Sequence, residues 1–532
     1  MAQTTGNYNG LVEPGRTVRL AGLLAAAALG APLVTPAPPS TLRTAIGEPA
    51  TLDPARARTA YDYAVVSRVF SRLVDSDAAL DLRPALARTW TVSEDGRTYV
   101  FRLTAARFHN GRPVEAKDVA GTLERVLAPG ASGPYAELLS VVEGARSFTQ
   151  GRAASIAGVR VLGPRDVEIR LEEPYASLLS LLTAPSLSIV PAAEATAAGA
   201  AFGRAPVGSG PFRFESWEPG SRITLVAHDG APEGRPAADG LTFVLLPQSA
   251  AVPARVMELL TTGAVDYVLV PPGPPQPVPG FEVRSHRELA VFFIGFNATS
   301  GPAADVRLRR AFRLGLDRSA FARQMLIDPS LLTDSIIPDG FPRTPRPVPS
   351  PDFEGARVLL KELAVGGKRP RLRLDYTAGR QEIQEAFVGL AAHFATLGLD
   401  ITLNRQPNLN ELMALTEAGR SEAWFGGMQA DYPNPDGLLR TMFRSRTQGA
   451  NGFRYRSAAM DDLLDRSRRT ADPRERTRLF ATLDELVAKD VPALPLWGRT
   501  YRYYIGDHVQ GLELSYFPFH FPLSRVSLLR RP

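Results

Sequence analysis

Apolar and polar residues alternate in a stretch near residue 100 that predicts a hairpin followed by a helix. Residues 98–103 alternate in the manner of a half-buried strand, and the turn sequence Ser93-Glu94-Asp95-Gly96 leads into them. A second turn, Phe108-His109-Asn110-Gly111, follows. Residues 116–120 then begin an apolar periodicity that runs through Leu123 and Leu127. We therefore expect a helix to begin near residue 115.

The rest of the chain repeats strand and helix patterns in alternation. A continuous apolar run at 289–297 predicts a buried strand, and further strands are expected at 42–46, 371–376, 400–404 and 424–430. Helical periodicity predicts helices at 306–327, 382–397 and 474–489. Such alternation is typical of an α/β layer structure.

Several short motifs follow one another in a fixed order along the chain. They are Thr51-Leu52-Asp53-Pro54, the run from Phe108 to Val119, Pro206-Val207-Gly208-Ser209-Gly210-Pro211-Phe212, Gly263-Ala264-Val265-Asp266-Tyr267, Asp305-Val306-Arg307-Leu308-Arg309-Arg310-Ala311 and Ala430-Asp431-Tyr432-Pro433-Asn434-Pro435-Asp436. In this order they resemble motifs of the solute-binding proteins that serve peptide, opine and nickel ABC importers, the bacterial extracellular solute-binding protein family 5. The resemblance covers roughly residues 42–500.

The resemblance implies an α/β fold with two lobes, the type II periplasmic binding protein fold in its large peptide-binding subclass, with mixed sheets flanked by helices. The first lobe would span residues 39–285 with an inserted subdomain at roughly 56–205, the second lobe would span 286–491, and residues 492–532 would return to the first lobe. Residues 1–38 would be a signal peptide and a Pro-rich spacer. Two connections between lobes permit closure around a ligand.

Composition agrees with a soluble globular protein and narrows the possible chemistry. The 532 residues are 44% hydrophobic and 22% charged, and no cysteine is present. Thiol nucleophiles, disulfides, zinc-thiolate sites and a cysteine-linked lipid anchor are therefore not expected. Arg16 and Arg19 precede the apolar segment 20–31, which predicts a signal peptide and a periplasmic protein without a lipid anchor. A buried Ala-rich helix is the alternative interpretation.

A net charge of +6 raises the question of nucleic-acid binding, but the basic residues are interleaved with acidic ones. The densest cluster, on the predicted helix 306–327, comprises Arg307, Arg309, Arg310, Arg313 and Arg318. We interpret it as a solvated helix face, with a phosphate-binding patch as the alternative. No nucleic-acid partner is expected. The 208–211 loop lacks nucleophile-elbow spacing and a following Lys, so it predicts a turn between strands.

Asp431 is the main candidate for ligand binding. In peptide-binding relatives the Asp of the matching motif faces the α-ammonium of the ligand, and the apolar strand at 424–430 would lead Asp431 into the cleft. The alternative is that Asp431 only begins an Asx-turn with Pro433 and Asn434. Trp424, Tyr432, Asn451 and Trp497 are further candidates for a pocket wall, and each could equally be a core or turn residue.

Enzymatic interpretations find little local support. The six histidines, at 109, 228, 286, 393, 508 and 520, are scattered and show no metal-ligand spacing. Neither catalytic residues, a metal site nor a cofactor is expected, although an exported hydrolase with a dispersed Ser-His-Asp triad stays possible. We expect a monomer that captures peptides or peptide-like solutes and delivers them to an inner-membrane ABC permease. Opines, glycosides, metal chelates and a chemoreceptor partner stay open.

Overall fold

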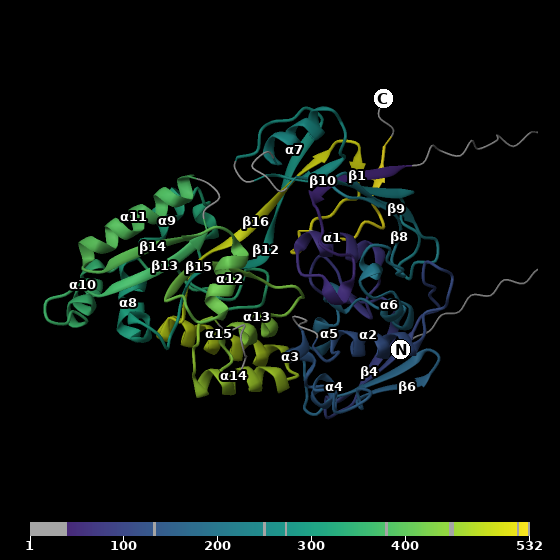
Figure 1. The fold of residues 1–532 in the computed structure, drawn as a ribbon, viewed down its shortest axis with the longest axis horizontal. Coiled ribbons are helices and arrows are strands. Elements are labelled where there is room, and N and C mark those ends of the chain that lie inside the picture. Colours follow the sequence, from purple (N-terminus) through teal and green to yellow (C-terminus); the bar gives the residue numbers. More distant parts are fainter. Residues whose placement is uncertain are drawn as a thin grey trace, which may run out of the picture. The chain divides into compact units, whose positions relative to one another are not determined.

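The computed structural model describes residues 40–130, 135–247, 252–271, 274–377, 381–445, 452–518 and 521–529. The predicted signal peptide and its spacer lie outside these ranges. In the part of the chain that is described, helices and strands form a mixed α/β architecture of several sheets (Figure 1). Within the same ranges, none of the helices combines the length and the apolar character that a membrane crossing would need.

The first lobe contains a four-stranded mixed sheet. Its strand order is β1 (Thr41–Gly47), β10 (Gly240–Leu246), β9 (Arg222–Ala227) and β8 (Phe212–Glu218), and β1 pairs with β10 in parallel. β1 confirms the strand predicted at 42–46. The core of this region joins the sheet to α1 (Ala60–Val69), α6 (Ala192–Ala198) and the end of the chain. α7 (Val252–Thr261) has a separate small apolar cluster.

A second four-stranded sheet lies in the inserted segment. Its order is β4 (Ala87–Val92), β5 (Thr98–Leu103), β7 (Asp166–Arg170) and β6 (Val159–Gly163), all antiparallel. β4 and β5 are the predicted hairpin, and α2 (Ala116–Val126) is the predicted helix. α2 begins where expected because Asp118 Oδ2 accepts a hydrogen bond from the Glu115 backbone N–H at 2.9 Å. Shorter elements complete the segment: β2 (Val74–Ser76), β3 (Leu82–Pro84), α3 (Ala136–Leu139), α4 (Ala145–Thr149) and α5 (Leu178–Leu181).

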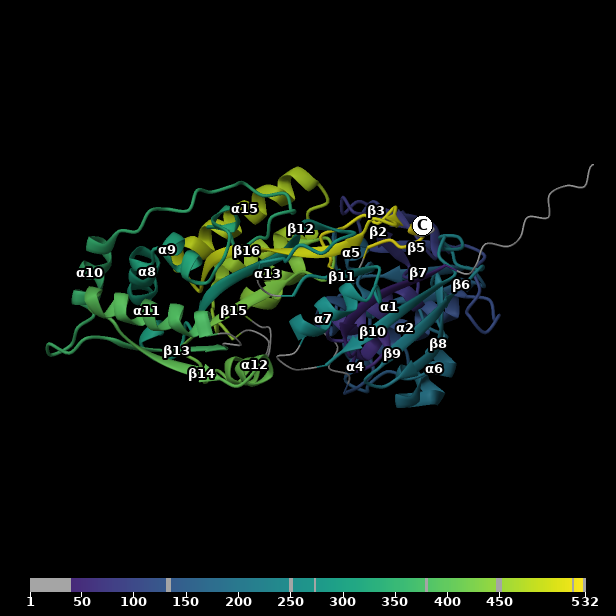
Figure 2. The ribbon, with the colours of Figure 1, turned by 90° about the horizontal axis from the view of Figure 1, so that it is seen from above.

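A six-stranded sheet contains the two longest strands of the molecule's described part. Its order is β11 (Tyr267–Leu269), β16 (Ala493–Gly506), β12 (Phe281–Phe296), β15 (Ala423–Gln429), β13 (Arg371–Thr377) and β14 (Asp400–Gln406). β12 and β16 run antiparallel and side by side (Figures 1 and 2). They extend from β11, which packs with the first lobe, to β15 and the strands of the second lobe. The strand predicted at 289–297 is the second half of β12.

Eight helices in the described residues accompany β13, β14 and β15. They are α8 (Val306–Gly315), α9 (Arg318–Gln324), α10 (Phe353–Glu362), α11 (Gln381–Leu397), α12 (Leu409–Glu417), α13 (Pro435–Phe443), α14 (Ala458–Arg469) and α15 (Pro473–Asp490). α11 and α15 confirm the helices predicted at 382–397 and 474–489. Figure 2 shows α8, α10 and α11 gathered near β13, where apolar side chains of these elements form one core.

The single helix predicted for residues 306–327 is wrong. The segment forms two helices, α8 and α9, because Asp317 takes an extended backbone conformation and caps α9. Its carboxylate accepts a hydrogen bond from the Ala320 backbone N–H at 2.9 Å. The apolar periodicity continued across this cap, so the periodicity alone could not reveal the break.

The prediction that the arginines of this segment form a solvated face is wrong for two of them. Arg309 is 5% exposed and Arg318 is 3% exposed. Arg309 donates hydrogen bonds to the backbone oxygens of Ala303 and Asp490, at 2.7 and 3.0 Å. Arg318 forms an ion pair with Asp334 at 2.8 Å. These guanidinium groups satisfy buried acceptors inside the protein, which also leaves the phosphate-patch alternative without support.

The 208–211 loop differs from the predicted turn between strands. It follows a short 3-10 helix, Gly199–Gly203, and precedes β8. A Cβ atom on Gly208 would lie 1.9 Å from the Val69 backbone oxygen. Glycine is therefore required here by close backbone packing against the end of α1.

Candidate ligand-binding site

Asp431 lies just beyond the end of β15, in the short segment before α13. Its Oδ2 accepts a hydrogen bond from Tyr135 Oη at 2.8 Å. The capping role in this segment belongs to Asn434, whose side chain accepts a hydrogen bond from the Asp436 backbone N–H at 2.9 Å. Thus the Asp431 carboxylate contacts a side chain from the inserted segment of the first lobe.

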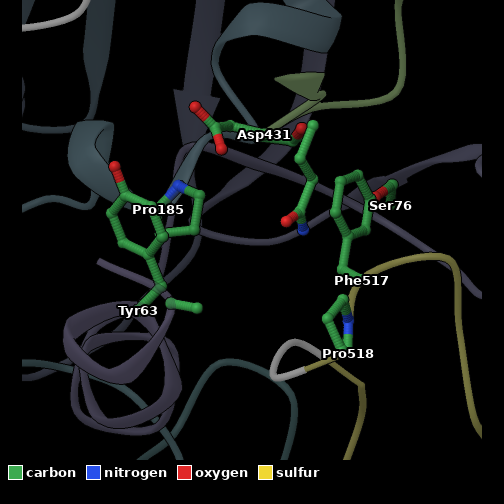
Figure 3. Close-up of a pocket in the computed structure, with 9 residues that line it drawn as sticks. Tyr63, Ser76, Pro185, Asp431, Phe517 and Pro518 are labelled. Atoms are coloured by element: carbon green, nitrogen blue, oxygen red, sulfur yellow. The ribbon is translucent and has the colours of Figure 1, made fainter. Parts of the chain in front are cut away.

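The Asp431 side chain lines a small, mostly apolar pocket (Figure 3). Tyr63 and Pro185 lie on one side of this pocket, and Ser76, Phe517 and Pro518 lie on the other. The remaining lining residues are Ala60, Thr183 and Gln429.

The pocket is assembled from segments far apart in the sequence. Tyr63 belongs to α1, Ser76 ends β2, and Pro185 begins the short 3-10 helix Pro185–Leu187. Gln429 ends β15, and Phe517 follows β16 near the end of the chain. Residues from the segments predicted for each of the two lobes therefore line one pocket.

Burial dominates the electrostatics around Asp431. It raises the pKa of the Asp431 carboxyl, and the hydrogen bond from Tyr135 opposes this rise. The pKa values of Tyr135 and Tyr63 are raised as well, first by burial and then by the nearby Asp431 charge. Among the described residues no Lys, Arg or His lies within ion-pair distance of Asp431. A desolvated carboxylate in this setting favours a cationic group from a ligand.

A larger cavity of about 660 Å³ adjoins this pocket. The two spaces share Ala60, Gln429 and Pro518 as lining residues. The wall of the larger cavity includes Glu288 of β12 and Arg499 of β16. Glu288 Oε2 and Arg499 Nε are 3.0 Å apart. A volume of several hundred Å³ is ordinary for a small-molecule site, so the two spaces together could accommodate a short ligand.

The other candidates from the sequence lie at different places. Tyr432 is 4% exposed and packs in the core of the inserted segment, where its ring meets the Tyr135 ring edge to face at 6.1 Å. Trp424 and Trp497 are buried in two cores of the second lobe. Neither tryptophan lines the two cavities described above. Asn451 lies outside the described residues.

Several pocket residues had no signal in the sequence. Tyr63 and Pro185 sit in otherwise ordinary helical segments, and Phe517 and Pro518 lie in an irregular segment. Tyr135 is the turn residue directly before the four-residue helix α3 and lies in no motif. Only the tertiary fold brings these residues to Asp431, so local pattern could not identify them.

The described histidines have structural partners. The ring nitrogens of His109, His228 and His393 form hydrogen bonds with backbone groups. His508 contacts Asp266 at 2.9 Å, and the same carboxylate binds the Arg43 guanidinium at 2.7 Å. Burial lowers the pKa of His109 to about 4. In the described ranges no cluster of three or more His, Asp or Glu side chains is arranged to hold a metal ion.

Known proteins resemble the chain along most of its length. It is 26% identical over 496 residues to the probable di/tripeptide-binding protein 5 of Pseudomonas aeruginosa, covering 87% of this chain and 90% of that protein. It is 25% identical over 504 residues to the probable deoxycholate-binding periplasmic protein YgiS of Escherichia coli, covering 90% of each.

Solved structures show the same fold. The binding protein AgaA of A. tumefaciens R10, in complex with agropinic acid, matches with a TM-score of 0.75 at 23% identity, covering 92% of this chain and 99% of the other. Haemophilus influenzae OppA, in complex with the peptide RPPGFSPFR, matches with a TM-score of 0.76 at 20% identity and the same coverage. These likenesses confirm the two-lobed periplasmic binding protein fold.

The family comparison covers more than half of the chain. The family described as bacterial extracellular solute-binding proteins, family 5 Middle, matches residues 81–450. This match includes the inserted segment, β12, the second-lobe strands and Asp431. The chain therefore belongs to the bacterial extracellular solute-binding proteins of family 5.

Proposed function

We propose that the protein captures short peptides or peptide-like solutes in the periplasm and delivers them to an inner-membrane ABC permease. The predicted signal peptide would direct it there. It acts in this proposal as a monomeric binding protein, without a catalytic role and without a nucleic-acid partner.

The observation that carries the proposal is the environment of Asp431. Its carboxylate lies on a pocket wall, is held in place by Tyr135 at 2.8 Å, and has a raised pKa because of burial. An α-ammonium group that enters the pocket would supply the missing positive charge and form a charge-assisted hydrogen bond. Free amino acids, peptides and related amines carry such a group.

The fold supports capture by closure. β12 and β16 are two adjacent strands that link the lobes, and each lobe keeps its own core. A ligand that contacts Asp431 from the second lobe and Tyr63 from the first has all its contacts only when the lobes are together. Such a ligand shifts the equilibrium toward the closed form by its differential affinity. The permease would then recognise the closed, loaded protein.

Relatives suggest peptides first and other solutes second. One relative is named for di- and tripeptides and another for deoxycholate, and a solved structure of the same fold contains agropinic acid. Deoxycholate has no ammonium group, so it would leave Asp431 without a counter-charge. The anionic pocket wall therefore favours the peptide class.

Thermal unfolding against a panel of compounds tests the proposal. The panel contains tri-alanine, mixed di- and tripeptides, single amino acids, deoxycholate and an opine. A ligand at about 100 times its dissociation constant adds about 2.7 kcal/mol to the free energy of unfolding, a readily visible shift. We expect stabilisation by peptides with a free amino terminus. Stabilisation by deoxycholate or the opine alone would agree with a solute-binding protein but would contradict the assignment of peptides as its ligands.

A further inference from the structure

The ligand proposed above carries a negative end as well as an ammonium group, and the sequence did not indicate what binds that end. Two arginines line the larger cavity: Arg204, which stacks on Trp217, and Arg499, which pairs with Glu288. Arg499 lines this cavity, its side chain is 50% exposed, and its Nε lies 3.0 Å from Glu288 Oε2. In the described part of the chain, Glu288 is its ion-pair partner, and the contact involves Nε. The two terminal nitrogens remain available for a second carboxylate.

Glu288 is the charged partner that attracts the Arg499 side chain. Glu288 is 2% exposed and stands directly opposite Arg499 in the antiparallel pairing of β12 and β16. A directly opposed pair places both side chains on one face of the sheet. Burial raises the pKa of the Glu288 carboxyl, and the Arg499 charge opposes this rise. Positions of the Arg499 side chain close to Glu288 are favoured, because separation would leave the buried carboxylate without its counter-charge.

The sheet register relates Arg499 to Asp431. Gln429 pairs with Ala290 on β12, and the Ala430 backbone N–H donates a hydrogen bond to the Leu289 oxygen at 2.8 Å. β15 ends at Gln429, and extension of its register with β12 by two residues would place Asp431 beside Glu288, on the side of β12 opposite to Arg499. Asp431 and Arg499 are thus separated by one intervening strand, which is two strand spacings or about 10 Å between backbones.

The alternation of side chains places these groups on the same face. Leu289 and Ala430 point into a core of the second lobe. Gln429 and Asp431 line the small pocket, and Glu288, Gln429 and Arg499 line the adjoining cavity. The Asp431 carboxylate and the Gln429 amide, from the β15 side, and the Arg499 guanidinium, from β16, therefore face two adjoining spaces.

We propose that Arg499, oriented by Glu288, binds the carboxylate of a zwitterionic ligand whose ammonium group is bound by Asp431. This inference rests on the proposed function and adds the second anchor and the length of the ligand. About 10 Å corresponds to roughly two or three extended residues, at about 3.3–3.6 Å for each residue. Gln429, two residues before Asp431 on the β15 side of the site, lines both spaces and can exchange hydrogen bonds with a peptide group of the ligand.

Isothermal titration calorimetry with three probes tests the second anchor. The probes are tri-alanine, its C-terminal amide and its N-acetyl derivative, each titrated into the purified protein. A hydrogen bond to a charged group contributes about 1.5–3 kcal/mol, which corresponds to an affinity loss of roughly 10- to 150-fold on amidation. We expect Arg499→Gln to weaken the binding of tri-alanine by a similar factor. The variant should also bind tri-alanine and its amide with equal affinity.

Matched variants separate Arg499 from its neighbours. Arg287 lies on β12, is 47% exposed and pairs with Asp339, so Arg287→Gln should keep the preference for a free carboxylate. Arg204 also lines the cavity and stacks on Trp217, and Arg204→Gln should keep the preference too. Asp431→Asn should remove the preference for a free amine and keep the preference for a free carboxylate.

Several outcomes would overturn the inference. Equal affinity of the wild-type protein for tri-alanine and its amide excludes a carboxylate anchor without the use of any variant. If Arg204→Gln loses the preference for a free carboxylate and Arg499→Gln keeps it, the carboxylate anchor is Arg204 and not Arg499. If amidation of tri-alanine lowers its affinity and acetylation does not, the assignment of Asp431 as the ammonium anchor is wrong and the assignment of Arg499 as the carboxylate anchor is retained. If none of the three probes binds the wild-type protein, the proposed peptide function fails and the inference fails with it.

Discussion

Replacement of Asp431 by asparagine should weaken ligand binding and stabilise the ligand-free protein. Asparagine keeps a carbonyl oxygen for the Tyr135 hydroxyl, which lies 2.8 Å from Oδ2 of Asp431, and removes only the charge. Loss of one member of a desolvated charged pair costs about 2–5 kcal/mol of binding free energy. This equals roughly a thirty-fold to a few-thousand-fold rise in the dissociation constant for a peptide with a free amino terminus.

The effect on stability has the opposite sign. Burial raises the pKa of Asp431 above its ordinary value in the folded protein. The stability linked to this group is therefore present at acidic pH, where the carboxyl is protonated, and is lost as the pH rises through the raised pKa. At neutral pH this carboxyl ionises more favourably in the unfolded chain than in the folded protein, which lowers the free energy of unfolding, and asparagine removes that penalty. The ligand-free variant should unfold at a higher temperature than the wild-type protein.

Thermal unfolding without ligand and calorimetry with tri-alanine measure the two effects. Asp305→Asn provides a control, because Asp305 caps α8 and its pKa is lowered, first by the hydrogen bond from Arg307. That variant should gain no stability at neutral pH and should keep its affinity. If Asp431→Asn were less stable and bound tri-alanine normally, Asp431 would be a turn residue and the proposed anchor would be refuted.

Three further expectations concern pH, backbone packing and a helix cap. Tri-alanine should bind most tightly above the pKa of Asp431 in the free protein and more weakly as the pH falls below it, because a protonated Asp431 must release its proton to bind an ammonium group. A dissociation constant that calorimetry finds to be the same at every pH would contradict this. Gly208→Ala should lower the free energy of urea unfolding by about 1–3 kcal/mol or more, because its Cβ would overlap the Val69 oxygen; an unchanged midpoint would refute that packing. Asp317→Ala should cost about 0.5–2 kcal/mol through loss of the α9 cap, and a cost near zero would show that the cap is dispensable.

Most of the strands and helices that hydrophobic periodicity predicted are present in the structure. β1, β5, α2, β13, α11, β14 and α15 appear where the pattern placed them, because each has one apolar face against a core. The break at Asp317 was missed because the apolar spacing of α8 continues into α9. The burial of Arg309 and Arg318 was missed because their partners are backbone oxygens and Asp334, which only the tertiary fold supplies.

The binding site was predictable only in part. The motif around Asp431 indicated the residue but could not reveal its hydrogen bond with Tyr135, which is separated from it by 296 positions. Arg499 gave no signal, since its alignment with Glu288 depends on the register of β12 against β16. Trp424 and Trp497 are large aromatic residues that suit either a wall or a core, and sequence alone does not distinguish the two.

Tyr432 has a consequence for the residence time of a captured solute. It follows Asp431 directly, and its ring is 4% exposed within the apolar cluster of the inserted segment. Separation of the lobes would withdraw this ring into water, at a cost of about 1.5–3 kcal/mol for a large apolar side chain. Dissociation through lobe opening would then be slower by roughly 10- to 150-fold. Tyr432 would thus act as a latch, and a permease that opens the protein would have to supply the work of releasing it.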